Sequence, residues 1–383
     1  MGAGGLIYNN NNVYILGAGY SHDAGLPLVS EFTNRMRDAF EAFERQEKRA
    51  ERDAIGTVLE FRRQATGAAE RVPLNLENIE EVFSLAAATG DVSLNRTAAL
   101  AIAATLDFAK TSAVPTTERA FILEGNSVPE GWTIESQGNW GTRKGVYCGC
   151  SRYDLLALTM SGFPDERGLN RADSVITFNY DTLVEDSLHR LQIPFNYGFD
   201  QNLPDFDNSA RCVRVAASDP TSAAAIHVLK PHGSINWAVQ TGRENPKVFG
   251  TYEQLRTEGL NPLLAPPTWN KNPAVLLSDV WDNAVSAIRS ATRIAIIGYS
   301  IPPMDLHFKY LLAAGLKNNN SLRNVFFVNP LARRLESRVE SVFRADLRPQ
   351  IVRLVDEDCR TFLLNDRDRF NRGSLPTARC TPC

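Results

Sequence analysis

Several short apolar segments of this 383-residue sequence end at glycine, hydroxyl or other polar residues of types that bind anions or move protons. The first segment, residues 13–16, is followed by the turn Gly17-Ala18-Gly19 and by the hydroxyl of Ser21. Glycines let a backbone come close to a phosphate group, and the positive end of a following helix attracts that group. The turn therefore predicts a site for a pyrophosphate, and a dinucleotide fits it better than a mononucleotide.

Four later strand-like segments also end at residues that can do chemistry. Residues 174–181 end in Asn179-Tyr180-Asp181, residues 225–233 contain His232, and residues 293–300 and 324–330 supply Gly298, Ser300 and Asn329. Imidazole titrates near neutral pH, which makes His232 the candidate general base. The alternatives are purely structural: a capping role for Asp181 at the start of a helix, and turn roles for Ser300 and Asn329.

The elements that must position these residues follow from the pattern between them. Helical patterns succeed three of the four later segments, so strands alternate with helices, as in a Rossmann-like, doubly wound parallel sheet of the α/β class. In such a sheet the residues after each strand converge on one crevice. Residues 31–169 are predicted to be an inserted, mostly helical subdomain, with an irregular connection at about 112–152; residues 1–30 and 170–383 form the nucleotide-binding domain.

Composition narrows the classes of function. The net charge of −3 lacks the basic excess of a non-specific nucleic-acid-binding protein, so no direct nucleic-acid contact is expected. No apolar run is long enough for a membrane span and no secretory leader is evident, which predicts a cytoplasmic protein without membrane contact. The six cysteines predict no disulfide framework; Cys148, Cys150, Cys380 and Cys383 are the set that could in principle bind zinc, and no metal is expected.

Four motifs in order resemble the sirtuin family: "GAGYSHDAGLP", "FNYD", "KPHGSINW" and "IGYSIPPMD". Individual segments, such as "NLENIEEVFSLA" and "HGSINW", are similar to those of the sirtuin-like branch of bacterial antiviral defence proteins that consume NAD. This resemblance covers residues 13–32 and about 174–330. It implies NAD as the substrate, with the following NAD-binding positions: Gly17, Ala18, Gly19, Ser21, Pro27, Asp181, Gly298, Ser300 and Asn329.

The resemblance also implies roles at the reacting centre. The amide of Asn179 would bind the ribose hydroxyls or a water, Asp181 would support the nicotinamide side, and His232 would act as the base. Protein deacylases of the family carry two CxxC pairs after the catalytic histidine, whereas no cysteine lies between His232 and Gly298 here. An NAD glycohydrolase that releases nicotinamide and ADP-ribose is therefore the leading hypothesis. A deacylase, an ADP-ribosyl transferase and a non-catalytic NAD or ADP-ribose sensor remain the alternatives.

Partners are implied by the resemblance alone. Sirtuin-like defence enzymes work as oligomers or with a second protein, so we expect a homo-oligomer and a partner such as a HerA-type ATPase. The sequence itself contains no ATPase P-loop. The remaining histidines, His22, His189, His227 and His307, are expected to be surface or packing residues, and Trp237 and Trp269 are expected to pack in the core or a lid.

Overall fold

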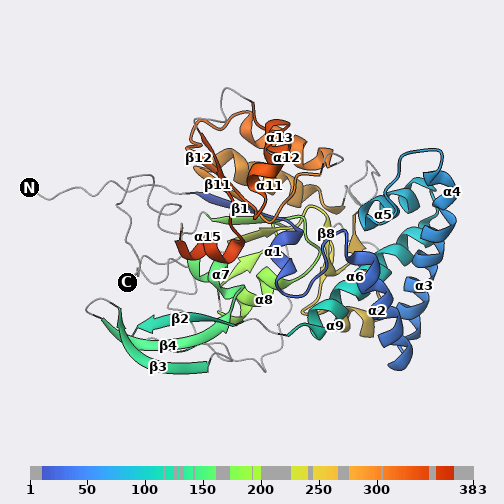
Figure 1. Cartoon of the computed structure of the whole chain (residues 1–383), viewed down its shortest axis with the longest axis horizontal. Helices are drawn as coiled ribbons and strands as arrows, with labels where there is room; N and C mark the ends of the chain where they lie inside the picture. The colour runs from blue at the N-terminus through green and yellow to red at the C-terminus, as the bar shows by residue number, and fades with distance from the viewer. Residues whose placement is uncertain are drawn as a thin grey trace, which may run out of the picture.

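The computed structural model describes residues 11–114, 117–123, 128, 133–140, 143–160, 173–191, 193–199, 226–239, 245–265, 276–302, 305–344 and 351–365. These residues form a central sheet with helices on both faces, a group of helices at one side and a separate strand ribbon (Figure 1). Trp269, Cys212, Cys380 and Cys383 lie outside the described residues, and so does any zinc site built from them.

A seven-stranded parallel sheet forms the centre of the molecule, in the order β13-β12-β11-β1-β5-β7-β6. The chain builds outward from β1 through β5 in one direction and from β1 through β11 in the other, so the strand order reverses at β1. This confirms the predicted doubly wound α/β fold. The strands are β1 (Asn12–Leu16), β5 (Ser174–Thr177), β6 (Phe195–Asn196), β7 (Ile226–Leu229), β11 (Arg293–Ile297), β12 (Asn324–Val328) and β13 (Val352–Val355).

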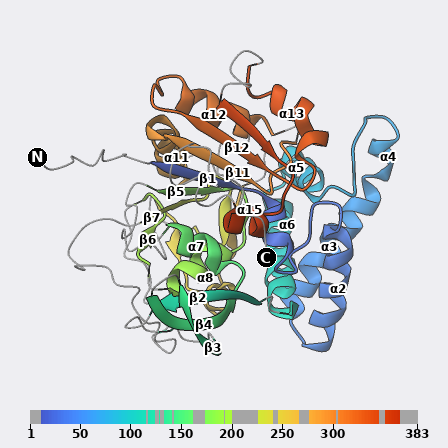
Figure 2. The same cartoon turned by 60° about the vertical axis from the view of Figure 1, so that its left-hand side comes forward.

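Strands β1, β5 and β11 are buried on both faces, which explains why they read as unbroken apolar runs rather than alternating patterns. Figure 2 shows α11–α13 on one face of the sheet and α7 and α8 on the other. The helices near the sheet in the described residues include α1 (Ala18–His22), α7 (Asp154–Met160), α8 (Leu183–Arg190), α11 (Ser278–Ser290), α12 (Leu306–Leu316), η1 (Ala332–Leu335), α13 (Glu336–Glu340) and α15 (Cys359–Asn365). The helical pattern that follows β12 in the sequence forms a 3-10 turn and then a short α-helix.

Residues 32–112 form five helices: α2 (Phe32–Arg45), α3 (Arg49–Gln64), α4 (Thr66–Ala69), α5 (Ile79–Ala88) and α6 (Val92–Ser112). Helix α2 buries Phe32, Met36, Ala39 and Phe43, the one-sided spacing of an amphipathic helix. Helix α6 packs against α2, α3 and α5 and is the centre of this group. The helical character predicted for residues 31–169 is confirmed over residues 32–112. The boundaries of the predicted domains stay a prediction.

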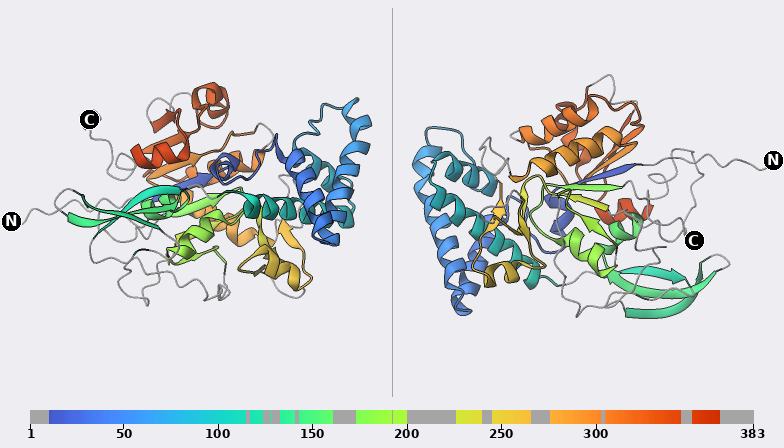
Figure 3. Two further views of the ribbon diagram at one scale, coloured as in Figure 1. Left: turned by 60° about the horizontal axis from the view of Figure 1, so that its bottom comes forward. Right: turned by 180° about the vertical axis from the view of Figure 1, so that it is seen from behind.

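Two smaller antiparallel sheets complete the described structure. One consists of β8 (Gly233–Ala238), β9 (Lys247–Val248) and β10 (Pro262–Leu264), with α9 (Tyr252–Thr257) beside it. The other, β2 (Thr117–Leu123), β3 (Thr133–Trp140) and β4 (Arg143–Ser151), extends away from the central sheet (Figure 3). The expectation of an irregular connection at 112–152 is therefore wrong. Among the helices of the described residues, none has the length and apolar character that a membrane span requires.

Candidate functional site

The glycine turn after β1 is held against the end of β11 by backbone hydrogen bonds. Gly17 N–H donates to the carbonyl of Ile297 over 3.0 Å, and Gly19 N–H donates to the carbonyl of Gly298 over 2.8 Å. Gly298 has a φ of +64°, a conformation that glycine adopts without strain. The turn and the strand end are therefore joined backbone to backbone at the point where the sheet order reverses.

This close contact leaves no room for a side chain at Gly17 or Gly19. A Cβ on Gly19 would lie 2.8 Å from the Gly298 oxygen and 2.9 Å from its Cα, and a Cβ on Gly17 would lie 2.5 Å from the Tyr299 side chain. The N–H of Gly19 is also already used, whereas Ala18, as the first residue of α1, has no acceptor within that helix. Pyrophosphate binding at this turn stays a prediction, with the Ala18 amide as its available donor.

Asn179, which follows β5, is tied to the same turn. Its Nδ2 donates to the Gly17 carbonyl and to the Ser21 hydroxyl, both over 2.9 Å. Ser21 in turn donates to Oδ2 of Asp181 over 2.7 Å. Both amide protons of Asn179 are thereby engaged, while its Oδ1 accepts no hydrogen bond from the described residues. Asn179 thus presents a fixed acceptor to a hydroxyl group or a water.

Asp181 is a member of this network and also contacts the start of α8. Its Oδ1 accepts the N–H of Leu183, the first residue of α8, over 3.0 Å. The N-cap position itself is Thr182, so Asp181 stands one residue before the cap, and the same carboxylate also holds Ser21. The two contacts fix the direction of α8 relative to the glycine turn.

A buried ion pair lies beneath Asp181. Nζ of Lys230 is 2.8 Å from Oε1 of Glu185 in α8, with side-chain exposures of 0% and 3%, and it also donates to the Asp181 carbonyl. Removing two charges from water is costly unless each finds a partner. The pair thereby ties the end of β7 to α8 and to the Asn179–Asp181 segment.

His232 lies in the tight turn between β7 and β8. Pro231 precedes it, and Gly233 N–H donates to the Lys230 carbonyl over 2.9 Å, which closes a β-turn. Gly233 has a φ of +84°, and a Cβ there would lie 2.1 Å from the carbonyl oxygen of Leu263 in β10. The local sequence Pro-His-Gly thus folds as a turn that fixes the histidine backbone.

The imidazole of His232 is buried in an aromatic setting. Its ring centroid is 5.0 Å from that of Phe178, which stacks in turn on Tyr299 at 5.5 Å. The pKa of His232 is lowered to about 4, mainly because a charged ring would lose its hydration when buried. Asp305 opposes this change in pKa, and His307 adds to it. The ring is therefore neutral near pH 7, and its Nε2 has no hydrogen-bond partner among the described residues.

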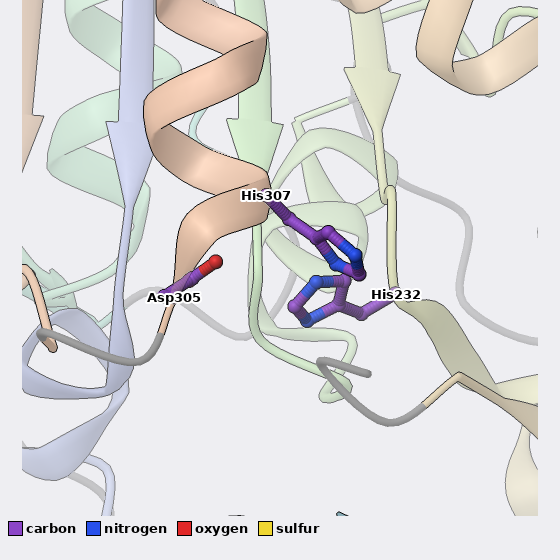
Figure 4. Close-up of side chains that lie close together, drawn as sticks. All are labelled: His232, Asp305 and His307. Carbon is purple, nitrogen blue, oxygen red and sulfur yellow. The ribbon is translucent and has the colours of Figure 1, made fainter. Parts of the chain in front are cut away.

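Asp305 and His307 lie beside His232, and the His307 ring packs edge-on against His232 and Trp281, in line with the packing role expected from the sequence. Figure 4 shows the two imidazole rings close together, with Asp305 to one side on the turn that precedes α12. One potential ligand atom from each of the three residues lies within 4.8 Å of the others. Both oxygens of Asp305 already accept hydrogen bonds, from Tyr299 Oη and from the N–H of Phe308. We assign no metal to this group.

A cavity opens next to this network, with an empty volume of ≈ 580 Å³ that includes its mouth. Five of the predicted site residues line it: Ala18, Ser21, Pro27, Asn179 and Asp181. The rest of its wall comes from Phe178 and Tyr180 and from helices of the 31–112 segment, including Glu80 of α5 and Leu106 of α6. His232 is joined to the cavity through its contact with Phe178.

Ser300 and Asn329 do not line this cavity, and neither do Gly17, Gly19, His232 and Gly298, which are described above. Ser300 is exposed after β11, and its carbonyl accepts a hydrogen bond from Arg338. Asn329 follows β12 and accepts the N–H of Leu331 over 2.9 Å, which is the turn role that the sequence left open. Neither contacts Asn179 or His232 by any described hydrogen bond, so their role in binding NAD stays a prediction.

Glu80, Lys230, Asp305 and Phe178 were not predicted from the sequence as parts of the site. Lys230, Asp305 and Phe178 stand within the quoted motifs "KPHGSINW", "IGYSIPPMD" and "FNYD", and their position there was a usable signal. Glu80 stands within the quoted segment "NLENIEEVFSLA", but a charged residue in a helix is usually on a solvated face, so nothing singled it out there.

Comparison with known families identifies the domain that carries most of these residues. Residues 173–346 match the family model of the SIR2-like domain. This sirtuin-like match starts just before β5 and ends before β13, so it contains Asn179, Asp181 and His232 and leaves out the glycine turn after β1. SIR2-like domains act on NAD, which supports an NAD-dependent enzyme with NAD as its substrate. A search of curated proteins gave no match.

Proposed function

We propose that this chain is an NAD glycohydrolase, which cleaves NAD to nicotinamide and ADP-ribose. The observation that carries the proposal is the fixed amide acceptor on Asn179 together with the neutral imidazole of His232, whose ring contacts that of the neighbouring Phe178. Both lie at the carboxyl ends of the parallel strands, where ligands of such sheets bind.

The reaction follows from the properties of these groups. The bond between the nicotinamide nitrogen and the ribose C1′ breaks, its electron pair goes to the nitrogen, and C1′ acquires positive charge. Oδ1 of Asn179 accepts a hydrogen bond from a ribose hydroxyl or from the attacking water, which holds the reactants in place. The water oxygen then bonds to C1′, and neutral His232 accepts the released proton.

The direct test mixes purified protein with NAD and measures free nicotinamide, with and without an acyl-lysine peptide. Release without peptide is expected. Asn179→Ala and His232→Ala should each lower the rate by at least about 100-fold, the usual contribution of one positioned general base. His22→Ala is the matched control, because His22 is an exposed histidine beside Glu31. Release that requires the peptide would indicate a deacylase, and binding of NAD without turnover would indicate a sensor.

The biological setting is a further part of this proposal and rests on the resemblance described above. We propose that NAD depletion serves bacterial antiviral defence, in a cytoplasmic homo-oligomer that is regulated by a partner such as a HerA-type ATPase. Light-scattering mass measurements on the chain alone and with the product of its neighbouring gene test both points. A monomer that ignores the neighbour and is fully active alone would contradict them.

A further inference from the structure

Glu80 is the carboxylate that the helical segment contributes to the cavity. It stands in the first turn of α5, where Asn78 caps the helix by accepting the Glu80 N–H over 2.9 Å. This cap sets the start of α5, and Glu80 lines the same cavity as Ser21, Asn179 and Asp181. A residue from a helix outside the SIR2-like match thus faces the residues at the end of β5.

The surroundings of this carboxylate are unfavourable to a negative charge. The α5 and α6 side of the cavity is otherwise apolar, with Ile79, Phe83, Ile102 and Leu106. Glu80 makes no ion pair and no side-chain hydrogen bond within the described part of the chain. Burial, followed by the nearby carboxylates of Asp305 and Glu81, raises the pKa of Glu80 to about 7. An anion held against an apolar wall and other anions gains most from a cationic ligand.

We propose that Glu80 selects the positively charged, oxidised nicotinamide ring, so that the site prefers NAD+ over NADH. The inference rests on the proposed function, because it assumes that the nicotinamide end of NAD occupies this cavity. NAD+ and NADH differ by one hydride on that ring, and only the oxidised ring carries a positive charge. A carboxylate beside it in a poorly hydrated cavity attracts the cation and gives the neutral ring no such advantage.

The other ionisable groups around the cavity do not supply this selectivity. Tyr180 and Tyr299 have pKa values raised well above 10 by burial, so both are neutral. His232 is neutral because burial lowers its pKa to about 4. Asp181 is engaged by Ser21 and by the start of α8, and Asp305 by Tyr299 and the start of α12. Glu81, next along α5, accepts the N–H of Asn75 instead.

Binding of the two dinucleotides tests the inference without turnover. Calorimetric titrations use the full chain with His232→Ala, with Glu80 intact or as Glu80→Gln, and Glu81→Gln is the matched control. We expect NAD+ to bind at least 10-fold more tightly than NADH when Glu80 is present. Glu80→Gln should reduce that ratio to about 1–2, leave ADP-ribose affinity within 2-fold, and leave the control ratio unchanged.

A pH series on the protein with intact Glu80 gives a second readout that needs no substitution at this position. Because Glu80 ionises near pH 7, the ratio of NAD+ to NADH affinity should rise at least 5-fold between pH 6 and pH 8. An equal preference for the two dinucleotides at pH 8, or a ratio that survives Glu80→Gln, overturns the inference. Nicotinamide release by the unmodified protein is measured in parallel: turnover without charge selectivity refutes only the role of Glu80, and selectivity without turnover refutes only the hydrolase.

Discussion

At the scale of single residues, Gly19 shows how a motif glycine can serve the fold before it serves a ligand. Its missing Cβ leaves room for the backbone of Gly298, to which it donates a hydrogen bond. Gly19→Ala should therefore lower the free energy of unfolding by about 1–3 kcal/mol, as overpacking does, measured by urea titration. Gly67→Ala is the control, since a Cβ there meets nothing within 4 Å. Unchanged stability with lost NAD affinity would instead support the pyrophosphate role.

Glu80 has a stability cost whose sign follows from its pKa. The unfolded chain has the ordinary value of 4.5 and the folded chain about 7, so the folded state holds the proton more tightly. The free energy of unfolding therefore falls as pH rises from 4.5 through 7, by no more than about 3 kcal/mol in total. Glu80→Gln should be more stable than the parent at pH 8 and equal to it at pH 4. Equal urea midpoints at pH 8 would show that the carboxylate is well solvated.

At the scale of elements, the Lys230–Glu185 pair couples β7 to α8 and to the segment that carries Asn179. Lys230→Met leaves a buried carboxyl group without its partner and should cost about 3–5 kcal/mol of unfolding free energy. Lys230→Met combined with Glu185→Met should recover most of this loss. Nicotinamide release should stay impaired in the double variant, because the Asp181 carbonyl also loses its donor. Full recovery of both properties would mean that the pair only fills space.

The sequence predicted the elements whose pattern is local and missed those that depend on distant neighbours. The parallel strands were predictable because burial on both faces requires continuous apolar runs. The β2–β4 ribbon was not, because its segments contain glycine and exposed polar residues without clean alternation. Asn179 and His232 were predictable as strand-end residues, whereas Glu80 reaches the cavity only through the packing of α5 on α6. No periodic pattern of apolar residues in the sequence indicates that Glu80 lines this cavity.

At the scale of the whole molecule, the proposed chemistry uses no metal. In the described part of the chain the close group of potential ligands is His232, Asp305 and His307, and Asp305 already accepts two hydrogen bonds. Incubation with EDTA or phenanthroline should therefore leave nicotinamide release unchanged. Elemental analysis of the same samples provides the check: stoichiometric zinc that leaves together with activity would contradict the prediction and direct attention to these three residues or to the cysteines outside the described part.

The position of β1 in the middle of the sheet has a consequence for how the chain is made. Val13 pairs with Ser174 and with Ile294, 161 and 281 positions further along, so β1 leaves the ribosome long before either neighbouring strand. At translation rates of about 5–20 residues per second, its second partner emerges roughly 15–60 s later. During that time an apolar strand lacks one side of its sheet, and the glycine turn lacks the backbone of Gly298. The nascent protein therefore lacks a finished strand-end site until β11 has been made, and the proposed NAD cleavage cannot begin before then.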